Sequence, residues 1–321
     1  MIKKIIKTLF FVIFLYFLLK QISFADILLV IRTIKPFYLL LGFFIYLILQ
    51  YLRSLRLMII LNLKHKNIFT LIRITIKHAF YVNVLPFRLG EVSMLGLLKK
   101  DLNRSYSEGI YSLFVSRLYD IFAIVLIGLT SSLLWSKVQQ TFFIILIFLA
   151  IIGVYILAVL LPFFIDLAMI ILKKMLKFKI LPKKMLTYIN TKSSQLNKNF
   201  NTINSIQTLN LILLSSICLW LSMYAIYFML TAVELKTPFG LFSFAVSFAF
   251  LANIIPANVF GTFGTQEVGW AAGFILLGVT ESIAVSTGIV SHFVVLFYST
   301  LSYGLMCIFN ITKIIMYNTN K

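Results

Sequence analysis

The chain has 321 residues, of which 61% are hydrophobic, and its mean hydropathy is +1.02. Soluble domains are about 45–50% apolar, so this composition excludes an ordinary soluble protein and predicts a single integral membrane domain over residues 1–321. The net charge of +20 does not indicate a nucleic-acid partner. In membrane proteins Lys and Arg collect in cytoplasmic loops, where they lie against anionic lipid.

Six apolar stretches are candidates for full membrane spans, which need about 20 residues each. They are 5–19, 37–61, 109–135, 141–164, 209–231 and 282–311. The first is short and follows two lysines, as in a signal peptide. No small-residue cleavage site follows it, so we interpret it as an uncleaved helix. These stretches predict an all-α, polytopic membrane protein.

Two further apolar stretches, 71–98 and 239–278, are interrupted by a repeated pattern. Residues 79–86 read Ala-Phe-Tyr-Val-Asn-Val-Leu-Pro, and residues 249–256, which lie 170 positions later, read Ala-Phe-Leu-Ala-Asn-Ile-Ile-Pro. Each copy places an asparagine (Asn83, Asn253) before a helix-breaking proline (Pro86, Pro256). Each stretch is therefore predicted to form two short helices, either as a re-entrant hairpin or as a kinked span. Broken segments at matching places in two halves indicate a transport site.

The distribution of Lys and Arg predicts the orientation. Most of them lie in residues 3–7, 64–104 and 166–207, which we expect in the cytoplasm together with both termini. The two hairpins would then enter from opposite faces as an inverted repeat, which provides two related conformations. The loop 166–207 is interpreted either as a basic amphipathic helix on the inner leaflet or as a solvated connector.

Ionisable residues inside membrane segments are candidates for function because they are costly there. Arg88 and Glu91 are three residues apart, and so are Arg117 and Asp120, so each pair shares one helix face and can form an ion pair. Arginine suits two-point contact with phosphate. Gly90 allows close backbone approach. Each pair is interpreted either as part of a headgroup site or as a fastener between helices.

The second half carries comparable groups. Glu267 lies 176 positions after Glu91, and His292 lies 175 positions after Arg117. A buried carboxylate can carry a proton, and histidine can carry a proton or contact a phosphate. A carboxylate facing the outer aqueous interface and a packing histidine are the alternatives.

Other charged and sulfur-containing residues are interpreted as structural. Arg53 and Arg56 lie near the cytoplasmic end of the second span and are expected to snorkel to the lipid headgroups as anchors, with a contact to a lipid phosphate as the alternative. Cys218 and Cys307 lie in apolar spans as packing residues. No motif for a nucleotide or a metal is found, so we expect no cofactor.

The residues from 83 to 120 resemble the lysylphosphatidylglycerol synthase transmembrane-region family, the flippase-like domain of multiple peptide resistance factors. They read Asn-Val-Leu-Pro-Phe-Arg-Leu-Gly-Glu at 83–91 and Ser-Arg-Leu-Tyr-Asp at 116–120, and the second half adds Gly-Thr-Phe-Gly-Thr-Gln-Glu at 261–267. The resemblance covers about residues 37–311. It implies a protein of a bacterial or archaeal cytoplasmic membrane that moves lipids or lipid-linked headgroups between leaflets. The aminoacyl-transferring domain has no counterpart in these residues, so we do not expect lipid aminoacylation by that mechanism.

The expected function is therefore that of a lipid flippase or scramblase, and an enzymatic role is less expected. Its partners would be membrane lipids with anionic or phosphate headgroups, and a homo-oligomer is compatible with this reading. The alternatives are a membrane enzyme or accessory factor in glycolipid or polysaccharide assembly, and a transporter of small soluble ions. The substrate-binding residues expected from the residues and the resemblance together are Asn83, Pro86, Arg88, Gly90, Glu91, Arg117, Asp120, Asn253, Pro256, Gly264, Glu267 and His292.

Overall fold

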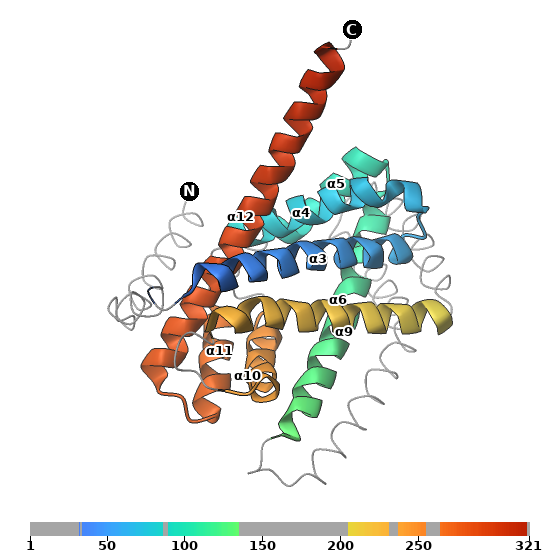
Figure 1. Ribbon diagram of the computed structural model, residues 1–321. Helices are drawn as coiled ribbons and strands as arrows, with labels where there is room; N and C mark the ends of the chain where they lie inside the picture. The colour runs from blue at the N-terminus through green and yellow to red at the C-terminus, as the bar shows by residue number, and fades with distance from the viewer. Residues whose placement is uncertain are drawn as a thin grey trace, which may run out of the picture.

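A computed structural model describes residues 32, 34–85, 89–134, 205–230, 237–254 and 264–319. Within these residues all regular structure is helical, as predicted (Figure 1). The elements are α3 (Pro36–Ile60), the short 3-10 helix η1 (His65–Asn67), α4 (Ile68–Val84), α5 (Leu89–Leu102), α6 (Tyr106–Ser132), α9 (Ser205–Leu230), α10 (Phe239–Ala252), α11 (Thr265–Leu276) and α12 (Glu281–Thr319).

Four of the described helices are long and apolar enough to cross a membrane. They are Pro36–Ile60, Tyr106–Ser132, Ile206–Phe228 and Glu281–Phe309. They confirm four of the six predicted spans and a polytopic membrane protein. The predicted spans 5–19 and 141–164 lie outside the described residues, and so does the predicted cytoplasmic loop up to residue 204.

Local sequence explains where several helices begin and end. α6 starts with a capping box, in which Ser105 Oγ accepts from Glu108 N at 3.2 Å and Glu108 Oε2 accepts from Ser105 N at 2.8 Å. α3, α5 and α11 are each followed closely by a residue with positive φ. These residues are Asn62 (47°), Asn103 (53°) and Gly278 (89°). Asparagine and glycine adopt this conformation at the least cost, so they stop these helices.

α3 and α9 form an antiparallel pair across the middle of the molecule (Figure 1). Arg56 near the end of α3 contacts Ser215 near the start of α9, whereas Gly42 near the start of α3 lies against Ala225 near the end of α9. A Cβ atom on Gly42 would come within 2.7 Å of the Ala225 carbonyl oxygen. Glycine is therefore what allows the two backbones to approach.

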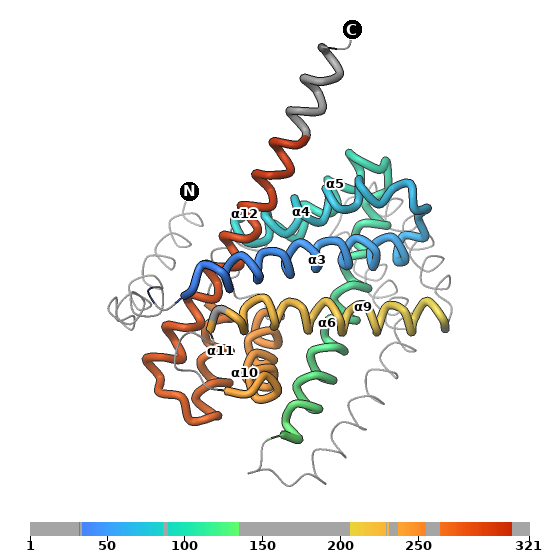
Figure 2. Tube along the Cα trace, viewed as in Figure 1, coloured from blue at the N-terminus to red at the C-terminus, as the bar shows by residue number. Residues whose placement is uncertain are grey.

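Both interrupted stretches form antiparallel helical hairpins, α4–α5 and α10–α11 (Figure 2). A Cβ atom on Gly90 of α5 would lie 2.2 Å from the Tyr81 carbonyl oxygen of α4. In the second hairpin, a Cβ atom on Gly273 would lie 2.2 Å from the Ala245 carbonyl oxygen. Because the two arms of each hairpin lie side by side, a single kinked span is excluded for both. The connections, 86–88 and 255–263, lie outside the described residues.

The packing joins the two halves of the chain. α4 of the first hairpin packs against α12, and α10 of the second hairpin packs against α6. The largest apolar core lies where α6, α10, α11 and α12 meet α3 and α9, and it contains the fully buried Phe242, Trp270, Phe274 and Tyr298. A smaller core joins α3 to the first hairpin. The first arm of each hairpin therefore lies against the last long helix of the other half.

Candidate functional site

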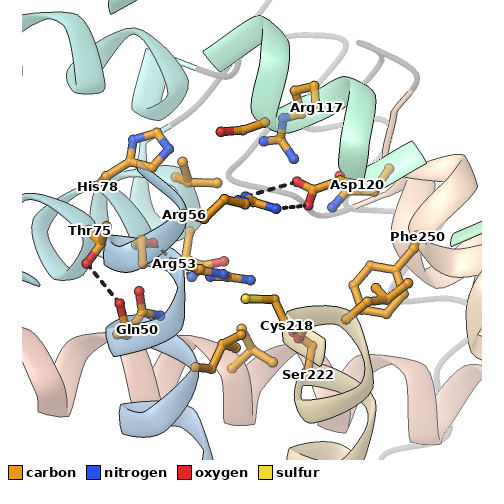
Figure 3. A pocket seen from close by; sticks show the side chains of 18 of the residues that line it. Gln50, Arg53, Arg56, Thr75, His78, Arg117, Asp120, Cys218, Ser222 and Phe250 are labelled. Carbon is orange, nitrogen blue, oxygen red and sulfur yellow. Dashed lines mark hydrogen bonds and ion pairs between the residues drawn. The ribbon is translucent and has the colours of Figure 1, made fainter. Parts of the chain in front are cut away.

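A cavity of about 370 Å³ lies between the two halves of the chain (Figure 3). Residues from α3, α4, α5, α6, α9, α10, α11 and α12 line it. It brings together five of the residues predicted from the sequence, namely Asn83, Glu91, Arg117, Asp120 and Asn253. Both asparagines of the repeated pattern thus line one cavity, although 170 residues separate them.

One of the two predicted ion pairs differs in the structure, and the other, Arg88–Glu91, stays a prediction because Arg88 lies outside the described residues. Arg117 Nη2 on α6 lies 2.9 Å from Glu91 Oε1 on α5. Asp120 forms an ion pair with Arg56 of α3, so the prediction that it pairs with Arg117 is wrong. Residues three apart on a helix differ in direction by about 60°. Arg117 therefore reaches the neighbouring α5, while Asp120 reaches α3.

The Arg56–Asp120 pair joins a buried arginine to a partly exposed carboxylate and makes several contacts. A second contact joins Arg56 Nη2 to Asp120 Oδ2 at 3.5 Å, and Arg56 Nη1 also donates to Ser215 Oγ of α9 at 3.0 Å. Arg56 is only 7% exposed. The pair therefore ties α3 to α6, and the serine ties it to α9. The Arg117–Glu91 pair differs because the arginine side chain is 49% exposed.

The interpretation of Arg53 and Arg56 as headgroup anchors is also wrong. Figure 3 shows both side chains projecting from α3 into the space that α6 and α9 border, and both line the cavity. A signal for this was present in the sequence. Tyr46, Gln50, Arg53 and Arg56 are spaced by four, three and three residues, which places them on one helix face. That shared face, rather than closeness to the membrane edge, determines where the arginines point.

The charged residues that line the cavity give it an excess of positive charge. Three arginines face two carboxylates, and arginine stays charged in proteins. Arg56 and Arg117 each have a carboxylate partner. Within the described part of the chain, Arg53 forms no ion pair. The cavity is therefore suited to an anionic group.

Glu267 and His292 form a second buried pair away from the cavity lining. Glu267 Oε1 lies 2.7 Å from His292 Nδ1, and the two side chains are 8% and 1% exposed. Glu267 Oε2 also accepts from Gly264 N at 2.7 Å at the start of α11. Gly264 has a φ of 111°, which only glycine adopts readily. The alternative that Glu267 faces an aqueous interface is wrong, because the carboxylate is buried.

The two halves repeat this pairing of a carboxylate with an arginine or histidine side chain. Glu91 contacts Arg117 between α5 and α6, and Glu267 contacts His292 between α11 and α12. The sequence offsets are 176 and 175 residues. The correspondence predicted between these positions therefore extends to their contacts.

Several of the predicted site residues do not line the cavity or lie outside the residues that the structure describes. Gly90 packs against α4 rather than lining the cavity. Pro86, Arg88 and Pro256 lie outside the described residues. Cys218 lines the cavity as a free thiol. No three His, Cys, Asp or Glu side chains in the described ranges gather closely enough to hold a metal ion.

Comparison with known proteins gave one match. The family model described as the lysylphosphatidylglycerol synthase TM region matches residues 4–302, which include both hairpins and every residue that lines the cavity. Comparisons with curated proteins and with solved structures gave no significant match. The family resemblance carried by the sequence motifs is confirmed. The chain belongs to the lysylphosphatidylglycerol synthase transmembrane-region family.

Proposed function

We propose that this protein moves phospholipids or lipid-linked headgroups between the leaflets of the cytoplasmic membrane, as a flippase or scramblase. The main observation in support is one cavity among helices long enough to cross a membrane, whose lining includes three arginines as well as Asn83 and Asn253 from the two hairpins. Polar and charged groups inside a membrane protein mark the path of a polar substrate. A headgroup would cross through the cavity while its acyl chains stay in lipid.

An inverted repeat would supply the two conformations that such movement needs. The halves α3–α6 and α9–α12 share one element order, a long helix, a hairpin and a second long helix, and α3 runs antiparallel to α9. His78 contacts Ser93 in the first hairpin, and Phe248 lies against Gly269 in the second. These positions correspond at the same offsets of 170 and 176 residues. The repeated contacts support two equivalent units of opposite orientation.

The two ion pairs at the cavity would have different roles. Exposed ion pairs contribute about 0–1 kcal/mol to stability, so a headgroup phosphate can compete with Glu91 for the half-exposed Arg117. Arg56 is far better shielded than Arg117 and has a second partner in Ser215. The Arg56–Asp120 pair would stay intact and hold α3, α6 and α9 together. The headgroup phosphate would therefore exchange at Arg117, with Glu91 returning when the lipid leaves.

The test is lipid movement in liposomes that contain the purified protein. Fluorescent phospholipids start in both leaflets, and dithionite quenches those in the outer leaflet. The proposal predicts nearly complete quenching with protein and about half with empty liposomes. Protein-containing liposomes that quench like empty ones would refute it. Consumption of a lipid-linked sugar would favour an enzyme of glycolipid assembly, and uptake of a soluble ion without lipid movement would favour an ion transporter.

A further inference from the structure

The face of α3 that borders the cavity carries three polar groups that the proposed function does not use. Tyr46, Gln50 and Arg53 lie at positions i, i+4 and i+7, so they form one stripe along the helix. All three line the cavity. Tyr46 is 4% exposed and Gln50 is 1% exposed, which places their polar atoms beside the cavity and away from bulk solvent.

The buried atoms of this stripe lack hydrogen-bond partners. Within the described residues, neither Tyr46 Oη nor the side-chain oxygen and nitrogen of Gln50 makes a hydrogen bond of normal geometry. The bond that Thr75 donates at 3.3 Å goes to the Gln50 backbone carbonyl (Figure 3). Tyr46 and Gln50 are neighbours, but a bond between them would still leave donors of the amide unused. Buried polar groups in native proteins are nearly always satisfied, so such a cluster calls for a ligand.

Charge identifies the ligand's class. Arg56 and Arg117 have carboxylate partners, whereas Arg53 has none in the described part of the chain. One uncompensated arginine matches one negative charge. Guanidinium, amide and hydroxyl groups can all donate hydrogen bonds, and the oxygens of a phosphodiester accept them.

We propose that the α3 stripe of Tyr46, Gln50 and Arg53 binds the phosphodiester of a lipid headgroup that carries one net negative charge. Arg53 pairs with the phosphate, and Gln50 and Tyr46 donate to its oxygens. This inference rests on the proposed function for its lipid source, and it assigns the phosphate a resting place that needs no exchange of ion pairs. Anionic headgroups bind more tightly than zwitterionic ones, because the ammonium group of a zwitterionic headgroup is repelled by the cavity's excess positive charge.

The test measures binding separately from movement. The full chain in maltoside detergent is titrated with water-soluble dihexanoyl phosphatidylglycerol, dihexanoyl phosphatidylcholine and the deacylated glycerophosphoglycerol, and heat is recorded by calorimetry. We expect phosphatidylglycerol to bind at least about tenfold more tightly than phosphatidylcholine, because both lipids offer the phosphate but only the choline cation is repelled by the uncompensated Arg53. Weaker binding of the deacylated compound indicates a lipid site, and equal binding indicates a site for soluble phosphodiesters, which would overturn the lipid assignment.

Variants locate the site on α3. Arg53→Gln is expected to abolish the preference for the anionic lipid, and Gln50→Leu to weaken binding of both lipids. Arg73 lies exposed on α4 and outside the cavity lining, so Arg73→Gln serves as the matched control and is expected to change nothing. If Arg53→Gln does not fold, Gln50→Glu makes the same test, because the new carboxylate pairs with Arg53 and excludes the anion.

The outcomes separate this inference from the proposed function. Equal affinity of the wild-type protein for both lipids overturns the stripe as an anion site, even if the protein moves lipids. An equal loss in Arg53→Gln and Arg73→Gln overturns it as well. A preference that depends on Arg53 upholds the site, even if reconstituted protein moves no lipid and the proposed function fails.

Discussion

The ion pair between Asp120 and Arg56 predicts that Asp120 is energetically coupled to Arg56 rather than to Arg117, and a double-mutant cycle tests this. Asp120→Leu leaves the buried Arg56 without its carboxylate, and removal of one partner of a buried pair costs about 3–5 kcal/mol. That loss is a large part of a typical stability of about 5–15 kcal/mol. Arg56→Met with Asp120→Leu is expected to recover most of it, because two apolar side chains of similar size pack without a charge to desolvate.

The matched control is the Arg117–Asp120 pair, which was predicted from its three-residue spacing in the sequence. Arg117→Leu with Asp120→Leu removes the Arg117–Glu91 contact and the carboxylate partner of Arg56, which are two separate interactions, so the two losses are expected to add. The assay is reversible unfolding of the detergent-solubilised protein in mixed micelles, followed by tryptophan fluorescence. The coupling energy is expected to exceed about 1 kcal/mol for Arg56 with Asp120 and to stay below about 0.5 kcal/mol for Arg117 with Asp120. The reverse order would refute the pairing in the structure.

Three further predictions concern packing and the headgroup contact. Gly273→Leu is expected to prevent folding, because a Cβ atom at this position clashes with a backbone carbonyl of α10. A Cβ atom at Gly304 has no neighbour within 4 Å, so Gly304→Leu is expected to be tolerated. Thermal unfolding of the two variants tests this: Gly304→Leu should keep the wild-type midpoint, and Gly273→Leu should show no folded protein. Thr287→Val leaves the buried Trp270 Nε1, which donates to Thr287 Oγ1 at 3.1 Å, without its acceptor. Its unfolding free energy is expected to fall by about 1–3 kcal/mol, and a change below 0.5 kcal/mol in denaturant titration would contradict this. Arg117→Lys is expected to fold normally yet lose most lipid movement in liposomes, because a point charge cannot make a planar two-point contact; normal movement would make Arg117 peripheral.

The hairpins show how far local sequence reasoning reaches. The Asn-x-x-Pro pattern predicted a break in each interrupted stretch, because proline interrupts a helix wherever it occurs. It could not decide between a hairpin and a kink, because that depends on how the two arms pack. Gly90 and Gly273 decide it, since the absence of a Cβ atom lets each second arm lie against the backbone of the first. Their role becomes visible only when the two arms are placed together.

The ion pairs show where sequence reasoning stops. The offsets that relate Glu267 to Glu91 and His292 to Arg117 were visible in the sequence, and the contacts follow them. The partner of Asp120 was not visible, because spacing along one helix does not reveal which neighbouring helix faces each side chain. The choice of Arg56 depends on how α3 packs beside α6, which is a tertiary property.

The central claim, that headgroups cross through the cavity between the two hairpins, is tested most directly by blocking that cavity reversibly. Asn253 lines the cavity, and Gly304 lies outside its lining. Cysteine is placed at one or the other position in a background with Cys218→Ala and Cys307→Ala. The variants are labelled with a bulky methanethiosulfonate, reconstituted and scored by dithionite quenching. Labelled Asn253→Cys is predicted to lose lipid movement and to recover it when the label is removed by reduction, whereas labelled Gly304→Cys is predicted to stay active. Unchanged lipid movement in labelled Asn253→Cys would contradict the claim.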